Sequence, residues 1–257
     1  MLHCSAADGG QWSKLNDRLG PGYEVFAPNQ IGCGDRPRWD GARPFTLSAE
    51  AEAVMRVLDG IDGPVHLVGH SYGGALALHV ALARPQELRS LTLIEPSAFH
   101  LLRHDGPLGR LRFNEIKRIA DGVGQAVLSG DLWGGMQAFV DYWNGPGDWA
   151  RAPEEVRGQL SRRLNKVTLD FRALFAEETT LGAMARIGAP TLVVQGDASP
   201  APSRQIVDML AGRIPGAQVA IVPGAGHMSP FTHAADVNDA IAAHIETAQV
   251  LSELRVA

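Results

Sequence analysis

The chain has 257 residues, 45% hydrophobic and 20% charged, which is the balance of an ordinary globular protein. A chain of this length can bury most of its apolar surface without a disulfide or metal, and its net charge of −5 argues against nucleic acid or an anionic membrane as a partner. Its two cysteines, Cys4 and Cys33, exclude a disulfide-rich secreted scaffold. Since no signal-peptide pattern and no membrane-spanning apolar run is present, we expect a cytoplasmic protein.

Four short apolar runs predict the strands of a parallel sheet. They lack the alternation of a half-exposed strand, are rich in aliphatic residues and end at glycine or proline turns, as expected of strands buried on both faces; they cover residues 65–69, 91–94, 191–194 and 219–222. A weaker fifth strand is predicted at residues 23–27. The sheet is therefore expected to be mostly parallel.

Helical patterns lie between the predicted strands. Residues 47–58 carry apolar side chains at Ala51, Val54, Met55 and Leu58, which is the stripe of an amphipathic helix. Further helices are expected at residues 75–83, 203–210 and 234–245. This alternation of strands and helices predicts a doubly wound α/β sheet.

The alternation breaks between residues 97 and 187, where helical patterns and aromatic residues occur without a convincing strand. We therefore predict an α/β core at 1–96 and 188–257, with a helical cap inserted at 97–187. An apolar substrate pocket under this cap is expected to be lined by Trp133, Trp143 and Trp149. Packing of these rings between cap and sheet is the alternative interpretation.

The motif Gly69-His70-Ser71-Tyr72-Gly73-Gly74 joins a predicted strand to a predicted helix. So sharp a turn strains the serine backbone, and its glycines leave room for the neighbouring chain. The serine hydroxyl is then raised above the sheet, where the N-terminus of the following helix favours developing negative charge. Ser71 is the predicted nucleophile; a glycine-rich turn that only packs is the alternative.

Over almost its whole length the chain resembles the α/β-hydrolase superfamily. Leu2-His3-Cys4-Ser5 resembles the oxyanion loop of that family, with Cys4 in place of the usual glycine. Asn29-Gln30-Ile31-Gly32-Cys33-Gly34 resembles its Asp-x-x-Gly-x-Gly turn. The resemblance implies an α/β-hydrolase fold with an oxyanion hole formed by the backbone N–H groups of Ser5 and Tyr72.

The start of the chain departs from the family pattern. In the family, several residues of a central strand precede the oxyanion loop, often after a hairpin, whereas here only Met1 and Leu2 precede His3. We therefore expect the opening strands of the sheet to be missing or truncated. Translation from a start further upstream is the alternative.

His227 follows the last predicted strand in a Gly-Ala-Gly-His sequence, where the family carries its catalytic histidine. A serine hydroxyl needs such a base to remove its proton near neutral pH. In the loop where the family usually has its acid, Ser199 occupies the expected position and Asp197 lies two residues earlier. Glu95 follows the strand after the nucleophile helix, the acid position of haloalkane dehalogenases. We prefer Glu95 over Asp197 because only Glu95 occupies a family acid position.

These residues predict a serine hydrolase, most simply a carboxylesterase, which acts on an ester or thioester of a small to medium, fairly hydrophobic substrate through an acyl-enzyme. The alternatives are a carbon–carbon bond hydrolase or cofactor-free perhydrolase on the same triad, and a ligand-binding sensor with little turnover. No cofactor is predicted, and no metal, because His100 and His104 lack a third ligand at a suggestive spacing. The expected partner is a small-molecule substrate, and the oligomeric state is left open.

Overall fold

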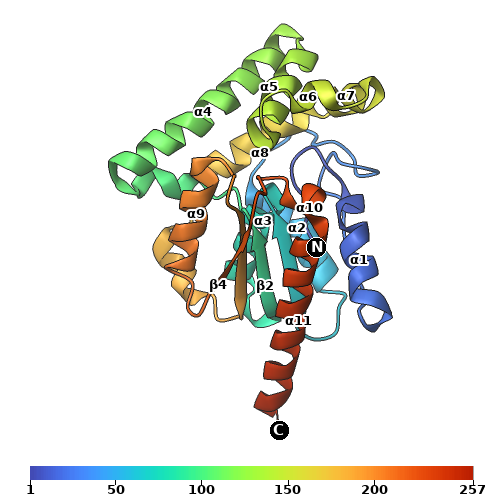
Figure 1. Ribbon diagram of the computed structural model, residues 1–257, viewed down its shortest axis with the longest axis vertical. Coiled ribbons are helices and arrows are strands. Elements are labelled where there is room, and N and C mark those ends of the chain that lie inside the picture. The colour runs from blue at the N-terminus through green and yellow to red at the C-terminus, as the bar shows by residue number, and fades with distance from the viewer. Residues whose placement is uncertain (257) are drawn as a thin grey trace.

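A parallel sheet of four strands lies between two layers of helices in the computed structural model, which describes residues 1–256 (Figure 1). The strands are adjacent in chain order: β1 (Val65–His70), β2 (Leu88–Ile94), β3 (Thr191–Gly196) and β4 (Gln218–Val222). All neighbouring pairs are parallel. The four main predicted strands are therefore confirmed.

The prediction of a weak fifth strand at residues 23–27 is wrong, since these residues form no strand in the structure. The chain segment beside them contributes only Leu2 to the sheet, in a single parallel bridge to Gly69. The ammonium group of Met1 donates to the carbonyl of Phe26 at 2.6 Å, but one such bond does not make a ladder. The residues at 23–27 have the composition of a strand, but no neighbouring strand pairs with them. Without such pairing, strand propensity alone does not form a strand.

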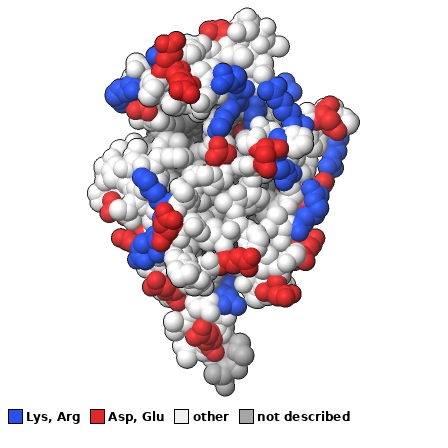
Figure 2. Space-filling view, turned by 90° about the vertical axis from the view of Figure 1, so that its right-hand side faces the viewer, with Lys and Arg blue, Asp and Glu red and all other residues white. Residues whose placement is uncertain are grey.

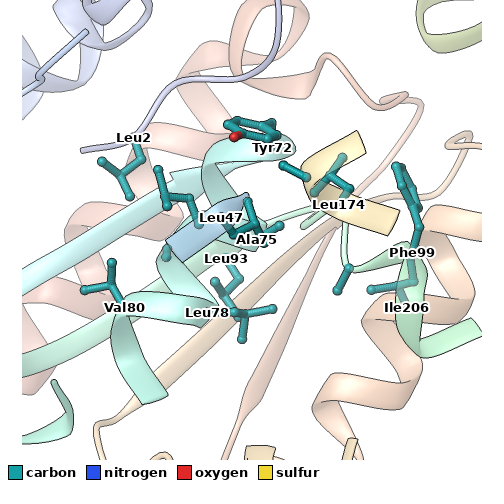
Figure 3. Packing of buried hydrophobic residues seen from close by; sticks show 14 of the residues in the cluster. Leu2, Leu47, Tyr72, Ala75, Leu78, Val80, Leu93, Phe99, Leu174 and Ile206 are labelled. Carbon is teal, nitrogen blue, oxygen red and sulfur yellow. The ribbon is translucent and has the colours of Figure 1, made fainter. Parts of the chain in front are cut away.

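Helices cover both faces of the sheet. One face carries α2 (Leu47–Leu58), α3 (Tyr72–Ala83) and α9 (Ala201–Ala211), and the other carries α1 (Ser13–Leu19) and α11 (Ala234–Val256). Successive strand residues point to opposite faces, so Leu93 belongs to the first buried cluster and Ile94 to the second. Both faces are apolar, which explains the unbroken hydrophobic runs. Figure 3 shows part of the first cluster.

Between β2 and β3 the described chain contains helices and no strand; we call residues 97–187 the cap. Its helices are α4 (Gly106–Ser129), α5 (Leu132–Asn144), α6 (Asp148–Arg151), α7 (Glu154–Ser161) and α8 (Leu164–Ala176). They lie together at one end of the sheet (Figure 1). Phe99 stacks against Trp143 of α5 and Phe171 of α8, with ring centroids 6.1 and 6.4 Å apart. Leu164 of α8 also belongs to the same buried cluster as Leu76 of α3 and Leu93 of β2, so cap and core share one apolar cluster.

The surface carries charges of both signs. On the face drawn in Figure 2, basic and acidic side chains are interspersed, and several basic ones lie toward the cap. Within residues 1–256, none of the helices combines the length and the apolar character needed to cross a bilayer.

Gly69 allows β1 to pack tightly against α3, and we predict that a side chain there destabilises the fold. A Cβ at this position would lie 2.3 Å from the carbonyl oxygen of Gly73 and 2.8 Å from the Cβ of Ala77. Overpacking of this kind costs about 1–3 kcal/mol, so Gly69→Ala should lower the free energy of unfolding, measured in urea, by about 2 kcal/mol. In Gly122→Ala, where nothing lies within 4 Å of the added carbon, stability should be unchanged or slightly increased. Equal stability of the two variants would contradict this account.

Candidate active site

Ser71 lies in the turn between β1 and α3, with φ of 55° and ψ of −116°. A residue other than glycine rarely adopts such a conformation, which costs on the order of 1–3 kcal/mol. Gly73 makes the turn feasible, because a Cβ there would lie 2.3 Å from the carbonyl oxygen of Leu2. The amide of Ser71 donates to the carbonyl of Ile94 at 2.9 Å. The serine is therefore held where the carboxyl ends of β1 and β2 meet.

Ser71, His227 and Glu95 form one continuous hydrogen-bonded chain. Nε2 of His227 lies 2.9 Å from Oγ of Ser71, and Nδ1 of the same ring lies 2.8 Å from Oε2 of Glu95. All three residues are buried, with exposed fractions of 7%, 2% and 1%. Because an ionised carboxylate only accepts hydrogen bonds, Nδ1 carries the ring proton and Nε2 can accept the proton of the serine.

Glu95 reaches this position because it directly follows β2, where its backbone has a φ of 42°. Its amide donates to the carbonyl of Val194 at 3.1 Å, which continues the pairing of β2 with β3. Oε1 accepts a hydrogen bond of 2.8 Å from the amide of Gly196 and another from the hydroxyl of Ser199. Together with His227, these donors compensate the cost of burying the carboxylate.

Asp197, the alternative acid, is placed elsewhere. Its side chain is exposed, and Oδ1 accepts from the amide of Gly224 at 2.7 Å. Asp197 thus closes the turn at the start of the loop that carries His227. The structure brings Glu95, and not Asp197, to the imidazole.

The loop after β4 crosses over the end of β3 to bring His227 to Ser71. The crossing requires glycine at position 196, since a Cβ there would lie 2.2 Å from the carbonyl oxygen of Ala225. The same carbonyl accepts from the amide of Ala198 at 2.9 Å. The ring of Trp143 then covers the imidazole, with ring centroids 4.2 Å apart.

Gln11 and His70 connect the segment that follows Leu2 to the histidine loop. Oε1 of Gln11 accepts from the amide of Cys4 at 3.0 Å, and its Nε2 lies 3.0 Å from Nδ1 of His70. Nε2 of His70 lies 3.0 Å from the carbonyl oxygen of His227 and donates to it. Burial lowers the pKa of His70 to about 3, so the ring is neutral and Nδ1 can accept from Gln11. Sequence reasoning missed Gln11, which belongs to none of the motifs.

The two residues expected to supply oxyanion donors both adjoin Ser71. Tyr72 is the first residue of α3, so its N–H has no acceptor within the helix. Ser5 lines the same cavity as Ser71 and His227. Ser5 thus lines the cavity to which Ser71 is open, and the N–H of Tyr72 is free of the hydrogen bonds of α3.

His3 holds the loop that contains Ser5. Its Nε2 accepts from the amide of Gln30 at 3.1 Å, and its Nδ1 donates to the carbonyl of Cys4 at 2.8 Å. Cys4 itself is buried, and burial raises the pKa of its thiol to about 12. A thiol of this kind is not a nucleophile near neutral pH.

A cavity of about 710 Å³ opens over Ser71 and His227 between the cap and the core. Trp143 and Trp149 are among its lining residues. Trp133 is not among its lining residues: it is 39% exposed and meets the ring of Trp149 edge-on at 5.3 Å. The structure thus brings two of the three predicted tryptophans to the cavity.

A profile of the Alpha/beta hydrolase family matches residues 1–240, and the chain belongs to this family. Lipase LipV of Mycobacterium tuberculosis is 40% identical over 97 residues, which cover 37% of this chain and 36% of LipV, so the match spans about a third of that relative. The pimeloyl-acyl-carrier-protein methyl ester esterase of Aeromonas salmonicida is 24% identical over 242 residues, covering 91% of this chain and 89% of the esterase. A crystal structure of a hydrolase from Pseudomonas aeruginosa PA01 matches with a TM-score of 0.72 and 27% identity, covering 95% of this chain and 89% of the other.

The buried, neutral His70 predicts a loss of stability in acid. Its pKa is about 3 in the folded protein and near the ordinary value of 6.5 in the unfolded chain, so the unfolded state binds more protons between these values. Stability is therefore lost as the pH falls below 6.5, by about 1.5 kcal/mol between pH 6.5 and 5 from this residue alone. In His70→Gln, the free energy of unfolding measured in urea should fall by about 1.5 kcal/mol less than in the wild type between pH 6.5 and 5. Replacement of the exposed His104 by glutamine should leave the loss at its wild-type size. An unchanged profile in His70→Gln would contradict the prediction.

Proposed function

We propose that this protein is a serine hydrolase that cleaves an ester or thioester through an acyl-enzyme on Ser71. The observation that carries the proposal is the hydrogen-bonded chain from the serine to the buried carboxylate: Oγ of Ser71 lies 2.9 Å from His227, whose other ring nitrogen lies 2.8 Å from Glu95. This order of nucleophile, base and acid is the one that acyl transfer needs.

The proposed reaction begins when Oγ of Ser71 attacks the carbonyl carbon and its proton passes to Nε2 of His227. Glu95 stabilises the imidazolium, and the N–H groups of Ser5 and Tyr72 stabilise the oxyanion. Collapse of the tetrahedral intermediate breaks the bond to the leaving alcohol or thiol, which takes the proton from His227. Water, deprotonated by the same imidazole, then attacks the acyl-enzyme, and the acid leaves as the serine regains its proton.

Two further observations support this reaction class and a moderately hydrophobic small-molecule substrate. Relatives of the chain include a lipase and a methyl ester esterase. The cavity over Ser71 has a largely apolar lining that includes Trp143 and Trp149, and sites of this character bind apolar ligands. A carboxylesterase is the simplest enzyme that fits both.

A fluorophosphonate probe should label the protein at Ser71, because activation by His227 makes this hydroxyl nucleophilic. Labelling, followed by mass spectrometry, should disappear in Ser71→Ala. Ser97→Ala is the matched control: its hydroxyl lies 3.1 Å from that of Ser71 but is not bonded to the histidine, so labelling should persist. Undiminished labelling of Ser71→Ala would exclude the proposed nucleophile. Labelling without turnover of any ester would favour a sensor or a different hydrolytic reaction.

Replacing Glu95 by glutamine should lower kcat about a thousandfold or more, because the amide keeps the size of the side chain but no longer stabilises the required imidazole tautomer and its cation. Asp197→Asn should stay within a few-fold of the wild type, because the side chain of Asp197 bonds, among the described residues, only to the amide of Gly224. The assay is hydrolysis of p-nitrophenyl esters of increasing acyl length, with circular dichroism to verify folding. Abolished activity in Asp197→Asn alone would show that Glu95 is the wrong acid.

A further inference from the structure

A second, much smaller cavity of about 10 Å³ lies beside Ser71, and we call it the recess. Apart from apolar side chains, its walls are the three serines Ser5, Ser71 and Ser97 and one carboxylate, Asp170 of α8. A cavity of this size holds about one water-sized group. The recess therefore accepts only a small part of a substrate.

Asp170 is 1% exposed, and only half of its carboxylate is satisfied. Oδ1 accepts from the ammonium group of Lys166, one helical turn earlier. By the distance and angle of an ordinary hydrogen bond, Oδ2 has no partner among residues 1–256. Burial raises the pKa of Asp170, while Lys166 and a weak hydrogen bond from the Ser5 hydroxyl act in the opposite direction; the Ser5 hydroxyl lies outside the geometry of an ordinary hydrogen bond to this carboxylate. A buried carboxylate oxygen without a donor is costly, so a donor brought by a ligand would be bound favourably.

Lys166 holds Asp170 in place and is itself shared with a second buried carboxylate. Its ammonium lies 3.1 Å from Oε2 of Glu50, whose Oε1 accepts from the amide of Ile31 at 2.7 Å. Burial by itself would lower the pKa of Lys166, but Asp170 and Glu50 raise it to about 12, so the lysine is charged. One ammonium group is thus shared by two carboxylates. Because this leaves the Asp170 carboxylate short of donors, the recess favours a ligand group that donates a hydrogen bond over one that accepts.

The position of His227 decides which part of an ester enters the recess. His227 lines the large cavity and is not among the residues that line the recess. In the proposed reaction His227 gives its proton to the leaving alcohol or thiol, so that group lies on the side of the large cavity. The acyl group then lies on the side of the recess, which limits it to a short chain.

We infer that the recess binds a hydroxyl group carried by the acyl part of the substrate, with Oδ2 of Asp170 as the acceptor. Because the recess adjoins Ser71, this hydroxyl lies on the first or second carbon beyond the reacting carbonyl. The substrate class is therefore an ester or thioester of a short hydroxy acid with a larger alcohol or thiol. The inference rests on the proposed function and adds Asp170 as the residue that selects the acyl group.

The test compares esters in which a hydroxyl replaces a methyl group of similar size: benzyl glycolate with benzyl propionate, and benzyl 3-hydroxypropionate with benzyl butyrate. In at least one pair, the ratio of kcat/KM between hydroxylated and unsubstituted ester should fall tenfold or more from wild type to Asp170→Asn. Comparing ratios between proteins cancels the intrinsic reactivity of each ester. Glu50→Gln is the matched control, since it disturbs Lys166 but leaves the Asp170 carboxylate, which lines the recess; it should keep the wild-type ratio.

An unchanged ratio in Asp170→Asn, or an equal fall in Glu50→Gln, would overturn the inference. A second measurement needs neither turnover nor a folded Asp170 variant. It determines, by NMR titration, how tightly the same ester pairs bind to Ser71→Ala. The hydroxylated member of at least one pair should bind at least fivefold more tightly, and equal binding within both pairs would overturn the inference. If the wild type cleaved no ester, the proposed function would fail, while the binding comparison would still decide the role of the recess.

Discussion

The turn between β1 and α3 holds Ser71 at a positive φ, and the remainder of the site is arranged around that strained residue. The strain, on the order of 1–3 kcal/mol, is offset by close packing that only glycine allows at positions 69 and 73. The hydrogen bond from the amide of Ser71 to Ile94 fixes the turn to the next strand. The serine hydroxyl therefore has one position relative to the sheet, against which the imidazole of His227 and the carboxylate of Glu95 are aligned.

Two buried carboxylates near the nucleophile differ in how completely they are satisfied. Glu95 accepts from Gly196, Ser199 and His227, so both of its oxygens have donors. Asp170 has a donor on one oxygen only among the described residues. A fully bonded carboxylate is rigid and suits the orientation of an imidazole, whereas an open oxygen suits the recognition of a ligand. The same type of side chain thus fits two roles because its surroundings differ.

The cap contributes to the site through its packing on the core. Helix α8 packs on α3 of the core within one buried cluster, and Lys166 of α8 reaches Glu50 of α2. Both contacts join elements far apart in the sequence, and both are buried. The walls of the cavity over Ser71 are therefore extensions of the apolar core, and substitutions in the cap can change the shape of this cavity while the hydrogen bonds of Ser71 stay intact.

The sequence by itself determined the four buried strands, the strained turn and the loop that carries the candidate base, because each is encoded within a few consecutive residues. It favoured Glu95 over Asp197 only by resemblance, suggested a strand at 23–27 that has no partner, and held no local signal for Gln11 or Asp170. Those features depend on which side chains meet across distant segments; Glu95 and its histidine are 132 positions apart. Only the tertiary structure decided them, because hydrogen bonds and burial are properties of spatial neighbours and a local pattern cannot specify which neighbours meet.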